Sequence, residues 1–96
     1  MAVYAIFNYD VADADGYKRY QQLAGPSFAG RSFKVLALDP ATTLVEGAQS
    51  GQQTVILEFE SKDAFDDWYR SPEYQSAVGV RWDATTNGVG LLVTGR

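Results

Sequence analysis

The stretch Ser71-Pro72-Glu73-Tyr74-Gln75 predicts a break between two helices. Serine is a favoured helix N-cap and proline is favoured at the first helical position, so a helix is expected to begin at this proline. Proline also disfavours helical angles in the residue before it, and the serine should therefore end the preceding helix. The break brings Tyr74 and Arg81, two turns apart, near Trp68 at the end of the first helix. Any binding site is expected here.

The composition excludes several classes of chemistry. The chain has 96 residues and contains neither cysteine nor histidine. Disulfides, zinc sites of the usual ligand types, thiol nucleophiles and imidazole bases are therefore excluded. Chemistry would have to use carboxylates, tyrosines, lysine, arginine, hydroxyls or backbone groups. We expect no metal and no cofactor, and the pattern assigns no catalytic residue.

The charge balance and hydropathy limit the partners and the location. The net charge is −4, from 12 acidic and 8 basic residues, and no basic patch is visible, so nucleic acid is not an expected partner. No apolar run is long enough to span a membrane, and no signal peptide is recognised, so we expect a cytoplasmic protein. Residues 1–96 are expected to form one domain.

The first half of the chain shows strand and helix patterns in turn. Residues 3–9 are largely apolar on both faces, as is typical of a central strand covered on both sides. Asp13 is a good N-cap for a helix that runs to about Ala24, where a glycine–proline pair should stop it. A second strand is expected at residues 32–38, followed at residues 42–46 by a short extended segment that is interpreted as an edge piece of the sheet.

The second half repeats the alternation. Residues 53–60 alternate apolar and polar side chains and form the clearest predicted strand. Ser61 should cap the next helix. The helix that begins at the proline of the opening stretch is expected to end near Val78. Residues 81–87 are expected to be irregular, and a turn should lead into a last strand at residues 89–94.

The order β-α-β-β-α-β predicts the ferredoxin-like α+β fold, in which a four-stranded antiparallel sheet carries its helices on one face. The first and last predicted strands are nevertheless apolar on both faces. The uncovered face therefore needs a partner. Two such sheets packed face to face form a dimeric α+β barrel, and we expect a homodimer.

A set of short motifs extends over nearly the whole chain. They are Asp13-x-x-x-Tyr17-x-x-Tyr20, Gly30-Arg31, Glu46-Gly47, Leu57-Glu58-Phe59, and Ser71-Pro72-Glu73-Tyr74-Gln75 followed by Arg81. In this pattern the chain resembles the family of domain of unknown function 1330. The resemblance implies a dimeric α+β barrel and leaves the reaction open. In the second strand the chain departs from the family, with Val35-Leu36-Ala37 where an arginine and paired glycines are usual.

Arg81 is the central residue of the expected site. Its guanidinium could hold the carboxylate or enolate of a small ligand, or it could form a salt bridge to Glu58, Glu73 or Asp83 that fixes the helix. Glu58 lies between two apolar residues of a strand. It could be an acid or base with a raised pKa in a dry pocket, or a residue that pairs across the dimer.

Aromatic side chains complete the candidate site. Tyr20, Trp68 and Tyr74 could be core residues whose polar tips are hydrogen-bonded. Together with Arg31 and Arg81 they could instead line a small cleft between sheet and helices. The predicted ligand-binding residues are Tyr20, Arg31, Glu58, Trp68, Tyr74 and Arg81.

These patterns are consistent with three functions. The first is a small dimeric protein that binds a small organic acid or aromatic molecule in the cleft. The second is a cofactor-independent enzyme of monooxygenase or isomerase type, which rests on analogy with the barrel superfamily. The third is a purely structural dimer module.

Overall fold

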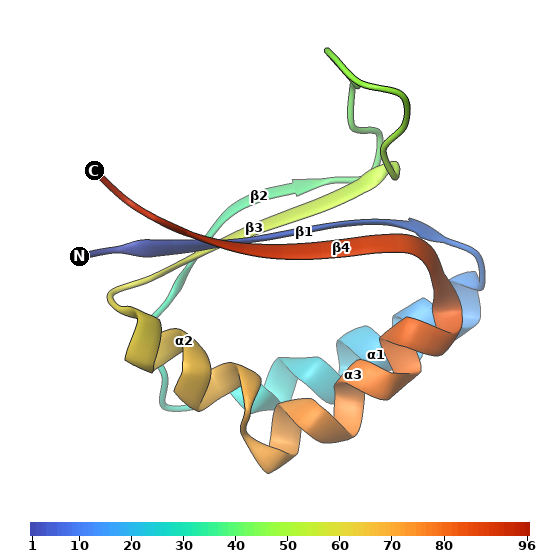
Figure 1. The fold of residues 1–96 in the computed structure, drawn as a ribbon. Coiled ribbons are helices and arrows are strands. Elements are labelled where there is room, and N and C mark those ends of the chain that lie inside the picture. Colours follow the sequence, from blue (N-terminus) through green and yellow to red (C-terminus); the bar gives the residue numbers. More distant parts are fainter.

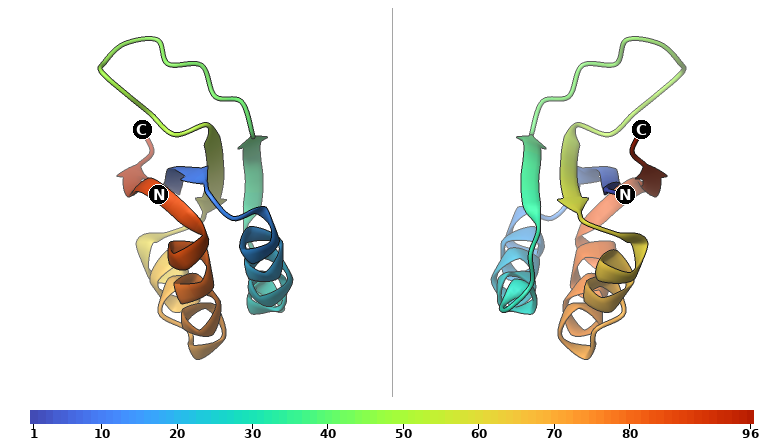
Figure 2. Two further views of the ribbon diagram at one scale, coloured as in Figure 1. Left: turned by 90° about the vertical axis from the view of Figure 1, so that its right-hand side faces the viewer. Right: turned by 90° about the vertical axis from the view of Figure 1, so that its left-hand side faces the viewer.

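The computed structural model describes residues 1–96, which form a four-stranded antiparallel sheet with all the helices on one face (Figure 1). The elements in chain order are β1 (Val3–Val11), α1 (Ala14–Ala24), the 3₁₀ helix η1 (Gly25–Phe28), β2 (Lys34–Asp39), β3 (Gln53–Phe59), α2 (Lys62–Tyr69), α3 (Pro72–Ala84) and β4 (Thr85–Thr94). Seen from either end, the sheet lies above two columns of helix, one made by α1 and the other by α2 and α3 (Figure 2). The predicted α+β class is confirmed.

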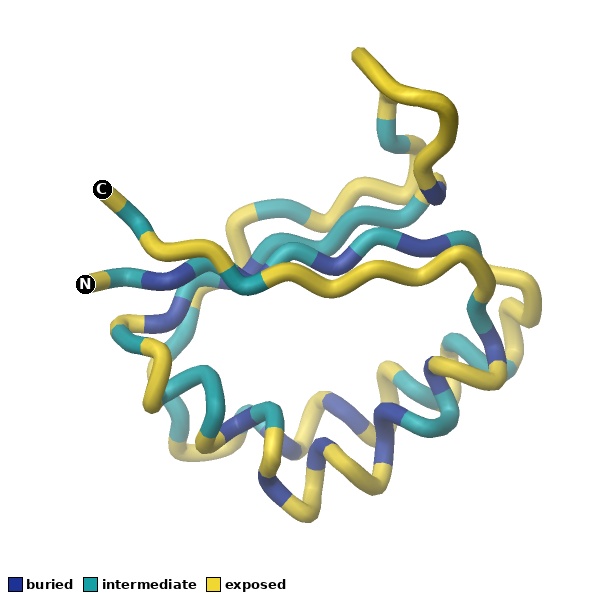
Figure 3. The backbone as a smooth tube through the Cα atoms, in the orientation of Figure 1, coloured by how far each residue is buried: buried dark blue, intermediate teal, exposed yellow.

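The strands are arranged in the order β2-β3-β1-β4, so β1 is central. It pairs antiparallel with β3, where Phe7 lies opposite Val55, and with β4, where Phe7 lies opposite Gly90. Alternate residues of β1 are buried under the helices, while the intervening ones face the open side of the sheet (Figure 3). This alternation follows from the two-residue period of a strand.

The core lies between β1, β3 and the helices. Trp68, Tyr74 and Phe59 are the largest fully buried side chains. The Trp68 ring lies 4.2 Å from the Tyr74 ring and 5.5 Å from the Phe59 ring, measured between centroids. The Trp68 indole donates a hydrogen bond of 2.9 Å to the Ser27 hydroxyl, so its polar atom is satisfied in the interior.

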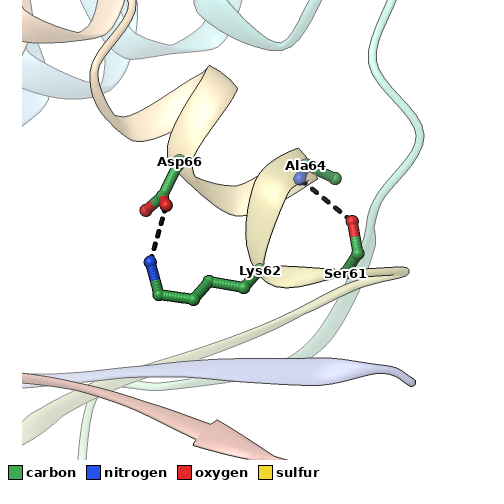
Figure 4. A network of polar contacts seen from close by, with 4 residues as sticks. All are labelled: Ser61, Lys62, Ala64 and Asp66. Carbon is green, nitrogen blue, oxygen red and sulfur yellow. Dashed lines mark hydrogen bonds and ion pairs between the residues drawn. The ribbon is translucent and has the colours of Figure 1, made fainter.

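The predicted helix caps are confirmed. Asp13 caps α1 by accepting a hydrogen bond from the Gly16 amide, and Ser61 caps α2 by accepting one from the Ala64 amide (Figure 4). Ser71 accepts a bond of 3.2 Å from the Tyr74 amide and donates one of 2.7 Å to the Trp68 carbonyl. Ser71 thus links the end of α2 to the start of α3, and α3 begins at Pro72 as the sequence predicts.

Three element predictions are wrong. Residues 42–46 form no strand: they belong to a loop that projects from the sheet on the side away from the helices (Figure 1). Helix α3 does not end near Val78 but continues to Ala84, and Arg81 is therefore helical. Strand β4 begins at once with Thr85 rather than after an irregular segment.

The structure gives the reasons for the two errors near the C-terminus. The Ala84 carbonyl accepts hydrogen bonds from the Ala12 and Asp13 amides, so the last turn of α3 is bonded to the start of α1. Asn87, expected in a turn, lies inside β4 with φ 56°, where the pairing with β1 shifts register. It forms a β-bulge, and asparagine tolerates such positive φ better than most residues do.

The side of the sheet opposite the helices carries exposed apolar residues. Val89, Leu91 and Val93 lie on this face of β4 and are 50%, 52% and 41% exposed. They pair across the sheet with Asn8, Ile6 and Tyr4 of β1. None of the helices is both long enough and apolar enough to cross a lipid bilayer.

Candidate functional site

A pocket of about 390 Å³ lies between the sheet and helix α1. Twelve of its fifteen lining residues are hydrophobic, and Arg81 is the only charged one. Val35 and Leu38 of β2, which line one side of the pocket, are 51% and 65% exposed. The volume lies within the roughly 300–1,000 Å³ typical of small-molecule sites.

Arg81 is held in this pocket by aromatic rings. Arg81 is buried, with only 7% of the residue exposed to solvent. The guanidinium carbon lies 4.9 Å from the centroid of the Phe7 ring, 5.4 Å from that of Tyr9 and 5.6 Å from that of Tyr20. One guanidinium nitrogen, Nη1, donates a hydrogen bond of 3.1 Å to the Tyr74 hydroxyl. Cation–π contacts of this kind stabilise a cation without neutralising it.

The predicted salt bridge of Arg81 to a carboxylate is wrong. The ion pairs of the structure are Lys34–Glu58, at 3.5 Å, and Lys62–Asp66, at 2.7 Å (the latter drawn in Figure 4). Glu58 lies opposite Tyr4 in the pairing of β3 with β1, on the open face of the sheet. Because successive strand residues point to opposite faces, Leu57 faces the helices and Glu58 faces away from Arg81.

The tyrosines around Arg81 form two hydrogen-bonded pairs. The hydroxyls of Tyr9 and Tyr17 are 2.7 Å apart, and those of Tyr20 and Tyr74 are 2.8 Å apart. Burial raises the pKa of Tyr9, Tyr17 and Tyr74 above the ordinary tyrosine value. These phenols are therefore neutral at pH 7 and provide no negative charge.

The charge of Arg81 persists in these surroundings. Burial by itself disfavours the guanidinium charge, but the interactions with Tyr74, Tyr20 and Tyr9 outweigh it and hold the pKa of Arg81 above its ordinary value. Arginine is in any case protonated throughout the accessible pH range. The pocket thus contains a permanent cation and no carboxylate.

The structure brings together only some of the predicted site residues. Tyr20, Trp68 and Arg81 line the pocket. Tyr74 is fully buried behind Arg81 and reaches the site through its hydrogen bond. Arg31 lies outside, where its guanidinium donates to the backbone carbonyls of Ser27 and Asp67. Glu58 lies on the other face of the sheet.

Several pocket residues were not predicted as site residues. Phe7 and Tyr9 of β1 were recognised only as members of an apolar strand, and Tyr17 of α1 as part of a family motif. The shared phenolic character of Tyr9, Tyr17 and Tyr20 was a usable signal. Phe28, the last residue of η1, and Phe33, just before β2, stack on each other at 4.2 Å and lie where no periodic pattern exists. No group of three or more acidic side chains is placed as a metal site would require.

Comparison with known proteins gives a family and a fold. The model of the family described as Domain of unknown function (DUF1330) matches residues 2–95. No curated protein matches the chain.

Three solved structures illustrate the fold similarity. A protein of unknown function from Rhodopseudomonas palustris is 19% identical with a TM-score of 0.81, over 99% of this chain and 82% of that chain. A dimeric ferredoxin-like protein of unknown function from Jannaschia sp. CCS1 is 14% identical with a TM-score of 0.71, over 99% of this chain and 100% of that chain. SnoaB, a cofactor-independent oxygenase from Streptomyces nogalater, is 18% identical with a TM-score of 0.68, over 99% of this chain and 93% of that chain. At these identities the likeness shows the fold alone.

Proposed function

The chain belongs to the family of domain of unknown function 1330, and we propose that its pocket binds a small aromatic molecule that carries an anionic oxygen, such as a carboxylate or an enolate. The aromatic walls suit a flat apolar ring, and the volume of about 390 Å³ suits a molecule of one to three rings. The anionic oxygen would lie against Arg81.

The observation that carries this proposal is the buried guanidinium of Arg81 without a carboxylate partner. The aromatic rings and the Tyr74 hydroxyl stabilise this cation but carry no negative charge, and an anionic ligand would provide the missing counter-charge. A guanidinium has five N–H donors, and the bond from Nη1 to Tyr74 leaves donors for a ligand. Its planar fork can hold both oxygens of a carboxylate, which a lysine ammonium cannot do.

The test compares two ligands that share a ring and differ in charge. Calorimetric titration with 2-naphthoate should show binding at least about tenfold tighter than with 2-naphthalenemethanol, because hydrogen bonds to charged groups contribute roughly 1.5–3 kcal/mol. Arg81→Lys should remove most of that preference. Arg31→Lys is the matched control, since Arg31 lies outside the pocket.

The melting temperature separates the ligand-binding role from a structural one. If Arg81 anchors a ligand, 2-naphthoate should raise the melting temperature of the wild type and of Arg31→Lys but not of Arg81→Lys. If Arg81 serves only the fold, Arg81→Lys should lower the melting temperature equally with and without 2-naphthoate. Equal affinity of the wild type for the acid and the alcohol would contradict the proposal.

A cofactor-independent oxygenase or isomerase is the second candidate. A fixed cation in an apolar pocket would stabilise an enolate or phenolate that forms during reaction, and SnoaB, of similar fold, is described as a cofactor-independent oxygenase. The raised pKa values keep Tyr9, Tyr17 and Tyr74 protonated at pH 7, so none of them would act as the base and the substrate would have to supply its own acidic hydroxyl. Oxygen uptake with 1,4-dihydroxynaphthalene above the spontaneous rate, lost in Arg81→Lys, would support it.

The active form would be a homodimer joined through the open face of the sheet. The support is the row of exposed apolar residues on β4, namely Val89, Leu91 and Val93, and the description of several structural neighbours as dimeric. A dimer that binds no ligand would be a purely structural module. The titration with 2-naphthoate distinguishes the two, because only a binding protein would show saturable binding.

A further inference from the structure

A second, smaller pocket of about 230 Å³ lies on the other side of Arg81. It shares Phe7, Tyr9 and Arg81 with the large pocket and is otherwise lined by residues of α2, α3 and β4. Arg81 is again the only charged residue of the lining. Arg81 therefore lines two separate spaces.

The small pocket exists because β4 lacks side chains at two positions. A Cβ built on Gly90 would lie 3.1 Å from the Phe7 ring, and one built on Gly88 would lie 3.8 Å from the Tyr9 Cβ, so both positions face the helices. The next residue of β4 on this face, Leu92, packs against the core. Glycine is unfavourable in a strand interior and often marks close approach by a ligand or another backbone.

We propose that this small pocket is a subsite for a carboxylate group, which Arg81 holds from the side of β4. The inference rests on the role of Arg81 as an anion anchor and not on the aromatic ligand of the large pocket. The space is smaller than the roughly 300 Å³ at which drug-sized ligand sites begin, and a short acid such as acetate or propionate fits within it. The carboxylate can come from a free short-chain acid or from the tail of an aromatic acid whose ring occupies the large pocket.

The variant Gly88→Val tests the subsite by filling it. The backbone at Gly88 has ordinary φ and the added Cβ would make a normal contact with Tyr9, so the strand should accept valine. Gly79→Ala is the control, because a Cβ at Gly79 meets open space on α3. Neither position belongs to the large pocket.

The measurement is calorimetric titration with sodium propionate at constant ionic strength. Saturable binding is expected in the wild type and in Gly79→Ala, with affinity lowered by about tenfold or more in Gly88→Val. Trp82, which lines only the small pocket, should report the same binding by fluorescence, and this signal should be absent in Trp82→Phe, where Trp68 of the large pocket remains.

A third ligand, 3-(2-naphthyl)propionate, distinguishes the two sources of the carboxylate. A free short acid is indicated if propionate alone binds and loses affinity in Gly88→Val. The tail of a larger acid is indicated if naphthylpropionate binds more tightly than 2-naphthoate and loses only this advantage in Gly88→Val. Either result supports the subsite.

The subsite would be overturned if Gly88→Val binds both propionate and naphthylpropionate with wild-type affinity. It would also be overturned if the wild type does not bind propionate and binds naphthylpropionate no more tightly than 2-naphthoate. The aromatic proposal fails on a different result, the absence of 2-naphthoate binding. If the wild type binds propionate but not 2-naphthoate, and Gly88→Val loses the propionate binding, the subsite is supported and the aromatic proposal fails.

Discussion

Arg81 and Tyr74 lie seven residues apart on one face of α3, and the Arg81 guanidinium donates a hydrogen bond of 3.1 Å to the Tyr74 hydroxyl. Seven residues are about two turns of helix, so the two side chains are aligned along the helix axis. Tyr74 is fully buried and its hydroxyl also bonds that of Tyr20, on α1. The direction of the guanidinium is thus set by its own helix and by the neighbouring one.

Tyr74→Phe should destabilise the protein by about 1–3 kcal/mol, because it leaves the buried Arg81 guanidinium and the Tyr20 hydroxyl without their hydrogen-bond partner. Urea denaturation followed by circular dichroism measures this change. Tyr69→Phe is the control, since no hydrogen bond of the Tyr69 hydroxyl is found, and it should lie within about 0.5 kcal/mol of the wild type. Equal effects of the two substitutions would refute the role given to Tyr74.

Ser71→Ala should lower the free energy of unfolding by about 1 kcal/mol or slightly more. The Ser71 hydroxyl caps α3 and also bonds the last turn of α2, and it is buried, so water cannot replace it fully. Ser76→Ala removes an exposed hydroxyl on the same helix and should have little effect. Chemical denaturation of both variants decides whether the cap matters.

The sequence predicted the parts of the fold that depend on local chemistry. Asp13, Ser61 and Ser71 are caps whose side chains need only the next few amides, so their residue types suffice to place them. The two-residue period of residues 53–60 likewise placed Leu57 and Phe59 in the core. These features require no knowledge of the rest of the chain.

The errors arose where contacts between distant segments decide the structure. Val78, Gly79 and Val80 are poor helix formers, which agrees with the predicted end of the helix near Val78. Packing of α3 against α1 overrides that preference, with Val78, Arg81 and Ala84 buried at intervals of three residues. The sequence placed Arg81 two turns beyond Tyr74 but assigned it to an irregular segment, and Glu58 was among its predicted partners although the strand period turns Glu58 away.

Gly51→Ala should destabilise the protein by about 2 kcal/mol. A Cβ at Gly51 would overlap the backbone carbonyl group of Tyr9. The loop cannot move away freely, since the Gly51 amide and carbonyl are both bonded to the Asn8 side chain, at 2.7 and 3.1 Å. Gly79→Ala, which meets no atom within 4 Å, should be neutral or stabilising. A wild-type melting temperature for Gly51→Ala would show that the loop adapts.

Leu91→Glu should convert the expected homodimer into a monomer. Leu91 lies opposite Ile6 on the open face of the sheet and is 52% exposed in the single chain. A carboxylate at this place would be buried in the dimer without a partner, which is strongly unfavourable. Light scattering at micromolar concentration measures the mass. Leu23→Glu, on the exposed side of α1, should leave the dimer intact. A monomeric wild type would disprove the interface itself.

The stability of the folded protein should fall as the pH rises above about 10. Burial raises the pKa of Tyr9, Tyr17 and Tyr74 in the folded state, while in the unfolded chain each has the ordinary value. Between the two values the unfolded chain has lost protons that the folded protein retains, so higher pH favours unfolding. Melting temperatures should therefore be constant near neutrality and decline in alkali, and the tyrosinate absorbance of these three of the six tyrosines should appear only with unfolding. Ionisation of all six at the ordinary tyrosine pKa, in a protein that remains folded, would show that the phenols around Arg81 are accessible to water and not held neutral by burial.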